Sequence, residues 1–557
     1  MYNEAMSQEI YTIKIAGPAG AGIKSAGQIL AKALIKSNYN LYDYSEYPSL
    51  VRGGHNTYQV SFSSQKVSFP HYQVDLFFAI APGHWQQHFD EFTKNTIVFS
   101  DEKCDSQKCN FISLPLGQIA QEAGGAMTIN TVCLGITSFL YNIDLKIIQD
   151  IVVKQYGKYA EINTKALNLG FKYAQQNFPK LQQKPKTNKT QKCPSYNDGN
   201  EAFGWGFLKG KGDFYAAYPM TPATGTLHFL AAKKEEYKIN VVHPEDEIAA
   251  ANMVVGASFA GARAATGTSG GGFALMVEAI SLAGVTETPS VFYLVSRPGP
   301  ATGLPTWTAQ GDLLFAINAG HGEFPKIVLS PSSHQEAFEM GVEALNLAAT
   351  YQTPVVVLND KMLGESGANT LDFSKQKPKV EYCAINKKPK SDFKRYSFDT
   401  KTGVSPLTLP GTPGGEYLSN SYEHDESGLS TEDPKLTVKM VDKRAKKLKS
   451  MLQDIPKPII YNMKAKKLII AWGSVASAVI ESGLKDYAIL HIKTLWPINK
   501  DIAKIINAYK EVVVVENNST SQLTTLLKSQ FNFNPTKIIV KYDGRPLFPE
   551  EIYEKLK

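Results

Sequence analysis

Three β-rich runs in the middle of the chain constrain the fold most strongly, because they carry no polar alternation. They read SVFYLVS, PKIVLSP and TPVVVLND at residues 290–296, 325–331 and 353–360. A strand with one solvated face alternates apolar and polar residues, whereas a strand covered on both faces does not. A helical stretch rich in Ala and Gly, residues 247–263, precedes these runs. The pattern therefore predicts an α/β fold with a parallel sheet between layers of helices.

Both ends of the chain repeat the α/β order. Residues 11–16 alternate like a strand, a glycine run follows from Gly17 to Gly22, and residues 23–37 have the periodicity of an amphipathic helix. Near the other end, residues 467–557 alternate β-rich runs such as EVVVVE with helical runs such as SQLTTLLKSQ. We expect a separate α/β domain at each end.

The length of 557 residues allows roughly three to four domains of ~150 residues. We expect three α/β domains joined by a polar, Lys-rich linker and by an extended segment rich in Pro, Gly, Ser and charge. The expected order is a first domain over 1–179, the linker over 180–196, a second domain over 197–369, the extended segment over 370–460 and a third domain over 461–557.

Charge and cysteine usage exclude several classes of protein. The net charge of +7 is small for this length, and much of it lies in two Lys-rich stretches, 180–192 and 439–449. We interpret these as solvated linkers or helix faces rather than as a surface for nucleic acid. No apolar run reaches the roughly eighteen residues of a membrane span, and the N-terminal sequence lacks the pattern of a secretory signal. The five cysteines form no CxxC pair, which fits the reducing cytoplasm and offers no closely spaced thiolates for an iron–sulfur cluster.

The first glycine run only partly resembles a dinucleotide-binding turn. Backbone amides at a helix start favour a phosphate group, but the spacing G-x-G-x-x-G fails. Counted from Gly20 the third glycine is Ser25, and counted from Gly17 the second position is Ala19. Asp43 is available for a ribose at the end of the second strand. Dinucleotide binding and a tight turn with another role are therefore both possible.

A loop with an adjacent arginine and two glycines follows in the same domain. It reads YSEYPSLVRGGHN at residues 44–56 and contains Arg52, Gly53 and Gly54. It is either a simple turn or a contact to a partner or an anionic ligand.

The second domain places polar residues at three strand ends. Thr221, Glu247 and Arg297 each stand where a β-rich run gives way to a turn. Ligands bind at the carboxyl edge of such sheets, and a hydroxyl, a carboxylate and a guanidinium there suit a carboxylate substrate and a cofactor nitrogen. A simpler interpretation also exists for two of them. Thr221 is a good N-cap with Pro222 at the first helical position, and an acidic residue complements a helix dipole.

Longer stretches resemble a known family. The gamma–alpha fused subunits of 2-oxoacid:ferredoxin oxidoreductases are similar over nearly the whole chain and in the same order. Three segments resemble the pyrimidine-binding domain of the alpha subunit: YPMTPAT, HPEDEIAAANMVVGASFAGARAATGTSGGG and SRPGPATGLPTWTAQGDL. Six later segments also resemble the alpha subunit: GVSPLTLPG, EHDESG, KRAKKLK, LWPI, VVVVENN and KYDGRPL. Residues 11–178, with GPAGAG and SEYPSLVRGGHN, resemble the gamma domain. YPMTP replaces YPITP, and Gly271-Gly272 stands where the family often has Pro-Gly. The resemblance also implies that the third domain is similar to the C-terminal domain of transketolase.

The resemblance implies coenzyme A-dependent oxidative decarboxylation of a 2-oxoacid to acyl-CoA and CO2, with electrons passing to ferredoxin. Glu247 would hydrogen-bond the aminopyrimidine of thiamine diphosphate, with Glu245 as the alternative. Arg297 would hold the substrate carboxylate, and Thr221 would donate a hydrogen bond to the substrate. 2-Oxoglutarate is the first expectation for the substrate, with branched-chain acids and pyruvate open. The residues expected to border the cofactor are Tyr218, Pro219, Glu247, Thr268, Ser269 and Gly270.

What the sequence lacks implies a partner. A thiamine enzyme needs a GDG run followed by an Asn to bind Mg²⁺ and the diphosphate, and no GDG run occurs. A beta subunit should supply Mg²⁺ and a 4Fe–4S cluster, in an alpha–beta dimer or a dimer of such dimers, and this chain should have no metal site and no activity alone. The alternatives are a subunit of a non-redox thiamine-dependent enzyme and a non-catalytic nucleotide-binding subunit.

Overall fold

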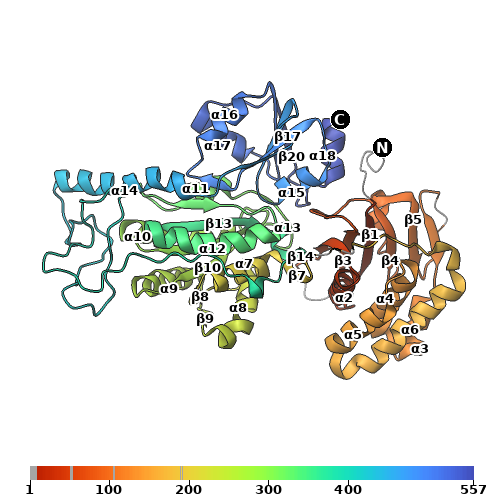
Figure 1. Ribbon diagram of the computed structural model, residues 1–557. Coiled ribbons are helices and arrows are strands. Elements are labelled where there is room, and N and C mark those ends of the chain that lie inside the picture. The colour runs from red at the N-terminus through yellow and green to blue at the C-terminus, as the bar shows by residue number, and fades with distance from the viewer. Residues whose placement is uncertain (1–8, 50–53, 105–106, 189, 191) are drawn as a thin grey trace.

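The computed structural model describes residues 9–49, 54–104, 107–188, 190 and 192–557. Three β-sheets of eight, seven and five strands organise the chain, each with helices packed against it (Figure 1). The α/β class expected from the sequence is confirmed.

The first sheet belongs mainly to the N-terminal part of the chain. Its strand order is β6-β5-β4-β1-β3-β2-β14-β7, and α4, α5 and α6 lie together on one side of it (Figure 1). The strands are β1 (Tyr11–Pro18), β2 (Asn40–Glu46), β3 (His55–Ser63), β4 (Val74–Ala79), β5 (Phe92–Ser100), β6 (Asn110–Ser113), β7 (Ser195–Asp198) and β14 (Gly367–Thr370). The helices are α2 (Ile23–Lys36), α3 (Leu116–Ala123), α4 (Ile129–Leu140), α5 (Leu145–Tyr156) and α6 (Ala160–Asn177).

The second sheet contains the uninterrupted apolar runs. Its order is β18-β12-β13-β11-β10-β8-β9, parallel except for β18. Every residue of β11 and of β13 is buried, as expected for strands covered on both faces. The strands are β8 (Phe214–Ala216), β9 (Asn240–Val242), β10 (Ala264–Thr268), β11 (Ser290–Ser296), β12 (Ile327–Leu329), β13 (Pro354–Asp360) and β18 (Thr494–Trp496).

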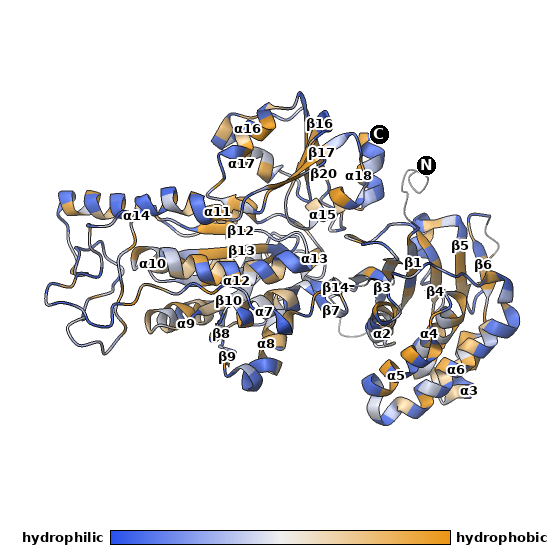
Figure 2. Ribbon diagram, viewed as in Figure 1, coloured by the Kyte–Doolittle hydropathy of each residue, from blue (hydrophilic) through white to orange (hydrophobic). Residues whose placement is uncertain are grey.

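Alternate residues of these strands point into two different cores. Phe292 and Val356 pack with α9, α10 and α11, whereas Tyr293 and Val357 pack with α7, α8 and α12. Figure 2 shows the inner strand β13 as a hydrophobic ribbon between the helices. The helices are α7 (Gly199–Lys209), α8 (Thr224–Tyr237), α9 (Glu247–Phe259), α10 (Gly270–Val285), α11 (Leu313–Asn318), α12 (His334–Tyr351) and α13 (Lys361–Glu365).

The third sheet lies in the C-terminal part, in the order β15-β17-β16-β19-β20. Its elements are β15 (Ile459–Tyr461), β16 (Lys467–Ala471), β17 (Tyr487–His491), β19 (Glu511–Glu516), β20 (Lys537–Val540), α15 (Gly473–Glu481), α16 (Asp501–Asn507), α17 (Gln522–Phe531) and α18 (Pro549–Leu556). Short 3-10 helices elsewhere cover Gln86–Glu91, Ala126–Thr128, Gly157–Tyr159, Pro179–Leu181 and Phe373–Lys375.

Strands cross between the regions that composition suggested. β7 and β14, from the middle of the chain, pair with each other, and β14 pairs with β2 of the first sheet. β18, from the C-terminal part, pairs with β12 of the second sheet. Strand pairing within the first and second sheets thus links segments that are far apart in the sequence.

The segment between the second and third sheets is largely irregular and ends in α14 (Pro434–Asp454). Lys443 and Lys447 of α14 are buried against Glu287. Burial opposes the ionisation of Glu287, but the two ammonium groups outweigh it and hold the pKa of that carboxyl well below its usual range. The interpretation of stretch 439–449 as a solvated face was therefore wrong for these two lysines, because a buried carboxylate needs cationic partners.

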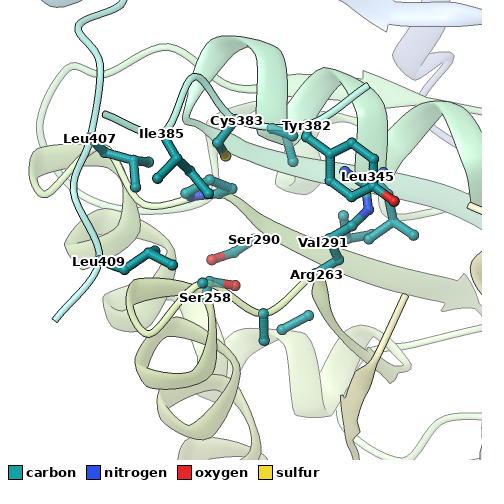
Figure 3. Close-up of a pocket in the computed structure, with 16 residues that line it drawn as sticks. Ser258, Arg263, Ser290, Val291, Leu345, Tyr382, Cys383, Ile385, Leu407 and Leu409 are labelled. Carbon is teal, nitrogen blue, oxygen red and sulfur yellow. The ribbon is translucent and has the colours of Figure 1, made fainter. Parts of the chain in front are cut away.

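A small cavity lies under this segment, at the amino ends of β10 and β11 (Figure 3). In this view Ser258 and Ser290 line it from below, Cys383 and Leu407 from above and Leu409 from the left. Its volume of about 50 Å³ suits a few water molecules. The cavity is far too small for a cofactor.

A buried histidine joins the first sheet region to the C-terminal helices. His71 Nε2 lies 3.1 Å from Glu481 of α15, and Nδ1 lies 3.0 Å from Glu550 of α18. Burial works against the imidazolium, but hydrogen bonds and charges from Glu481 and Glu550 outweigh it and raise the pKa of His71 to about 9. The protonated ring is therefore part of the native contact.

This contact predicts a pH dependence of stability. The pKa is raised in the folded state, so its contribution is complete below the usual value of 6.5 and is lost as the pH rises through about 9. At about 1.4 kcal/mol per pKa unit the contribution is on the order of 3 kcal/mol. We expect the difference in thermal midpoint between the wild type and His71→Gln to shrink over this window. A difference that stays constant with pH would contradict the charged state of His71.

Among the described residues, no single helix is long and apolar enough to cross a membrane. The pair Leu116–Ala123 and Ala126–Leu140 passes by length and composition when taken together, but it is bent by 111°.

Candidate active site

The polar strand ends of the second sheet lie along one edge. β11, β10, β8 and β9 are neighbours in that order and run parallel. Arg297 directly follows β11, Thr221 lies in the turn after β8, and Glu247 begins the helix that follows β9. The structure thus brings the three residue types to the carboxyl edge, the usual ligand-binding edge of such sheets.

Arg297 and Thr221 are in direct contact. Arg297 Nη1 donates a hydrogen bond to the carbonyl oxygen of Thr221 at 2.7 Å. Helix α8 begins at Thr224 with Ala223 at its N-cap, so the expectation that Thr221 caps this helix was wrong. The turn that contains Pro222 separates Thr221 from the helix. This leaves the Thr221 hydroxyl free of a capping role.

Glu247 is buried at the start of α9 with no capping duty. Asp246 is the N-cap, and its carboxylate accepts a hydrogen bond from the amide of Ala249 at 2.8 Å. Glu247 is only 4% exposed, and its Oε1 has no hydrogen-bond partner within the described part of the chain. Glu245 is exposed. A buried, unpartnered carboxylate oxygen costs free energy unless a ligand satisfies it.

The start of α10 lies against this carboxylate. A Cβ on Gly272 would come within 2.5 Å of Glu247 Oε1 and 2.1 Å of Thr268 Oγ1. Ser269 stands at the N-cap position of α10, but its buried Oγ makes no hydrogen bond to any residue that the structure describes. A Cβ on Gly270 would come within 3.0 Å of the Asp312 carboxylate. Glycine at positions 270 and 272 therefore lets the start of α10 approach Thr268 and the carboxylates of Glu247 and Asp312 closely.

Sequence reasoning missed Asp312. Its carboxylate accepts a hydrogen bond from Ser296 Oγ at 2.6 Å. Burial raises the pKa of Asp312, while the Ser296 hydrogen bond and the Arg297 charge act in the opposite direction. Partial burial also lowers the pKa of Arg297, against the pull of Asp312, but a guanidinium stays protonated. Asp312 lies in the run SRPGPATGLPTWTAQGDL, but no role was assigned to it from the sequence.

The remaining predicted cofactor contacts border the same edge. Tyr218 is 38% exposed, and its ring centre lies 5.9 Å from that of His243. Pro219 is half-buried beside it. Thr268, the last residue of β10, is buried and points its hydroxyl at Met220 Sδ, 3.8 Å away.

Asp43, the residue proposed to bind a ribose next to the first glycine run, is not available for that role. The strand–turn–helix order is as expected, with Gly22 in the left-handed region before α2. Asp43, however, is buried and accepts hydrogen bonds from the Tyr58 and Tyr196 hydroxyls and from the amide of Gly367. Its carboxylate thus joins β2 and β3 to β7 and β14 within the first sheet. Of the loop over 44–56, Arg52 and Gly53 lie outside the described residues.

Helices α9 and α10 also carry an exposed apolar face. Ile248, Met253 and Leu275 are 49%, 39% and 49% exposed. The two helices pack against each other, and Ile248 directly follows Glu247 in the chain. Exposed apolar surfaces of this kind commonly mark a protein interface.

Among the described residues, no group of His, Cys, Asp or Glu is arranged to hold a metal ion.

Family models match both of the first two regions. Residues 206–443 match the model described as "Pyruvate flavodoxin/ferredoxin oxidoreductase, thiamine diP-bdg", and residues 12–173 match "Pyruvate ferredoxin/flavodoxin oxidoreductase". The region of the second sheet therefore matches a thiamine diphosphate-binding domain of an oxidoreductase.

Individual relatives narrow the family. The alpha subunit of 2-oxoacid:ferredoxin oxidoreductase from Sulfolobus sp is 31% identical over 97% of this chain and 96% of its own length. The 2-oxoglutarate oxidoreductase subunit KorA from Mycobacterium tuberculosis is 27% identical over 98% and 90%. A solved structure is also similar, with a TM-score of 0.92, 30% identity and 99% coverage of both chains: the 2-oxoglutarate:ferredoxin oxidoreductase from Magnetococcus marinus with 2-oxoglutarate, coenzyme A and succinyl-CoA bound.

The chain belongs to the family of 2-oxoacid:ferredoxin oxidoreductase alpha subunits. Subunit names of this kind indicate that it is one member of an oxidoreductase complex. The resemblance inferred from sequence motifs is confirmed.

Proposed function

We propose that this chain, together with a beta subunit, carries out coenzyme A-dependent oxidative decarboxylation of 2-oxoglutarate to acyl-CoA and CO2, with electrons passing to ferredoxin. The observation that carries the proposal is the buried Glu247 carboxylate, whose Oε1 has no partner among the described residues at the ligand edge of the sheet. The substrate assignment is supported by two similar proteins, whose names specify 2-oxoglutarate.

The donor set around Glu247 fits the aminopyrimidine of thiamine diphosphate. When bound, this cofactor supplies an acidic carbon, C2, that attacks the carbonyl of a 2-oxoacid. Glu247 would hold the proton at the ring nitrogen N1′, because its Oε1 lacks any competing donor in the part of the chain described. Asp246 already caps α9, so Glu247 is available for this role. Exposed Glu245 is a weaker candidate, since water satisfies it.

The other residues at this edge of the sheet would bind and orient the substrate and the cofactor. Arg297 would form a charge-assisted contact with the substrate carboxylate, and its Nη1 also donates to the Thr221 carbonyl. Thr221 would donate a hydrogen bond from its hydroxyl to the substrate. The residues proposed to border the cofactor are Tyr218, Pro219, Glu247, Thr268, Ser269 and Gly270.

A beta subunit would complete the site. The chain has no GDG run and five scattered cysteines, so the diphosphate, Mg²⁺ and a 4Fe–4S cluster would be held by the partner. The exposed side chains of Ile248, Met253 and Leu275 on α9 and α10 offer apolar surface for docking. The resulting assembly would be an alpha–beta dimer or a dimer of such dimers.

The test compares the chain alone with the co-purified complex. We expect the complex, assayed with coenzyme A and a viologen dye, to reduce the dye with 2-oxoglutarate faster than with pyruvate or branched-chain 2-oxoacids. The isolated chain should be colourless and inactive. Thiamine-dependent turnover by the single chain would refute the shared site. A complex without cluster absorption would point to a non-redox thiamine enzyme, and NAD binding by the isolated chain to a nucleotide-binding subunit.

A further inference from the structure

The loop that follows Arg297 has little secondary structure of its own. Within it, the amide of Leu304 donates to the carbonyl of Pro298 at 3.0 Å, and the amide of Trp307 donates to the carbonyl of Leu304 at 3.2 Å. Leu304 is 43% exposed. Two local hydrogen bonds leave such a loop many conformations, so contacts from outside must determine where it lies. We call residues 298–308 the substrate loop.

The C-terminal region supplies these contacts through the segment KYDGRPL. Gly544 accepts a hydrogen bond from the amide of Thr308 at 3.0 Å. The Arg545 guanidinium carbon lies 3.3 Å from the centre of the Trp307 ring. Gly544 has a φ of +83°, and a Cβ there would come within 3.0 Å of Leu304. The backbone of this segment therefore packs directly on the substrate loop, and the guanidinium stacks on its one tryptophan.

A second C-terminal segment, VVVVENN, holds the chain just beyond the loop. Gln310 and Asn517 are joined by two hydrogen bonds: the amide of Gln310 donates to the carbonyl of Asn517 at 2.7 Å, and the amide of Asn517 donates to Gln310 Oε1 at 3.1 Å. Gln310 is 1% exposed. The far end of the loop is thus fixed, and Thr308 is also held by the amide of Met362, which donates to its Oγ1 at 3.1 Å. The contact that Arg545 adds is therefore the one to the Trp307 ring.

Arg545 also reaches the first sheet. Its Nε lies 3.8 Å from Oε1 of Glu46, the last residue of β2. The Glu46 side chain is 14% exposed, and the Tyr44 hydroxyl donates to the same oxygen at 3.2 Å. One guanidinium therefore contacts the first sheet and the substrate loop at once, while its own backbone belongs to the C-terminal region.

We infer that Arg545 is a positioning residue for substrate binding: stacked on Trp307 and facing Glu46, it holds the substrate loop so that Arg297 meets the 2-oxoacid carboxylate. The inference rests on the proposed function of Arg297. Arg545 itself is not a catalytic residue, since its contacts are with Trp307 and Glu46 and it acts through the loop.

The contacts of Arg545 determine which variants test the inference. Arg545→Ala removes the stacked plane and the charge. Arg545→Lys keeps the charge but loses the planar group that stacks on an aromatic ring, so it should rescue little. Lys541→Ala is the matched control, because it removes a cation from the same segment that pairs with Glu551 instead of the loop.

Two readouts on the complex with its beta subunit test the inference. Hydrogen exchange of peptides covering 298–308 should rise about three- to tenfold in Arg545→Ala, in line with the loss of one cation–π contact, and stay unchanged in α12. The KM for 2-oxoglutarate should rise by a similar factor, while kcat and exchange of the thiamine C2 proton change by less than about twofold. Lys541→Ala should match the wild type in both.

The outcomes separate the two claims. Unchanged loop exchange in Arg545→Ala would overturn the positioning role, as would faster exchange with an unchanged KM. A full rescue by Arg545→Lys would show that charge alone matters, contrary to the stacking argument. If the wild-type complex turns over no 2-oxoacid at all, the proposed function fails, and the exchange data still report whether Arg545 orders the loop.

Discussion

Replacing Glu247 by Gln should reduce exchange of the C2 proton of bound thiamine diphosphate by about 10²–10⁴-fold, the usual scale for a positioned acid–base group. Glutamine keeps the shape of the side chain but cannot hold the N1′ proton as a carboxylate does. Exchange is the right measurement, because it precedes the substrate, the cluster and ferredoxin. NMR of the quenched cofactor from the assembled complex would follow it directly.

The structure sharpens this prediction by separating two acidic roles. Asp246 caps α9 through the Ala249 amide, so Asp246→Ala should cost about 0.5–2 kcal/mol of stability and leave exchange nearly normal. Glu247→Gln should do the reverse, since its Oε1 has no partner to lose among the described residues.

Glu245→Gln is the matched control at the exposed position. It should exchange almost like the wild type. If Glu245→Gln slows C2-proton exchange and Glu247→Gln does not, then Glu245 rather than Glu247 is the residue at the aminopyrimidine. If both exchange normally, Glu247 does not contact the aminopyrimidine.

The apolar runs were enough to predict the central fold. β11 and β13 are buried throughout, as their lack of polar alternation required. The carboxyl ends of β9 and β11 also located Glu247 and Arg297 at one edge, because the parallel strands of one sheet share that edge. Strand pairing between distant segments was not predictable in this way. β14 pairs with β2 through Ala368 and Tyr42, and a four-residue strand of this kind carries no periodic signal.

Local rules also failed where tertiary contacts prevail. Thr221 followed by Pro222 has the pattern of a helix start, yet α8 begins at Thr224, and the Thr221 carbonyl accepts from Arg297 instead. Lys443 in a Lys-rich stretch was expected to be solvated, but it pairs with buried Glu287, far away in sequence. Asp43 was a possible ribose ligand and proved to be an acceptor for two tyrosines. Long-range partners decided each case.

Arg297→Ala should lower kcat/KM for every 2-oxoacid, because the carboxylate that Arg297 is proposed to hold is common to all of them. Losing one charge-assisted hydrogen bond should cost about 1.5–3 kcal/mol, a loss of roughly 10–150-fold in kcat/KM. Exchange of the thiamine C2 proton should stay normal, since Glu247 is intact. Arg297→Lys should recover only part of the activity, because a lysine cannot form a bidentate contact with a carboxylate.

The pattern across substrates separates this role from two others. If Arg297 held the second carboxylate of 2-oxoglutarate, Arg297→Ala would lose that substrate selectively and spare pyruvate. If it only supported the turn through its bond to the Thr221 carbonyl, C2-proton exchange and stability would fall together with kcat/KM, since the displaced turn lies at the same sheet edge as Glu247. A uniform loss with normal exchange is expected only if the guanidinium meets the shared carboxylate. Measuring kcat/KM for 2-oxoglutarate, pyruvate and a branched-chain acid in the same variant distinguishes all three.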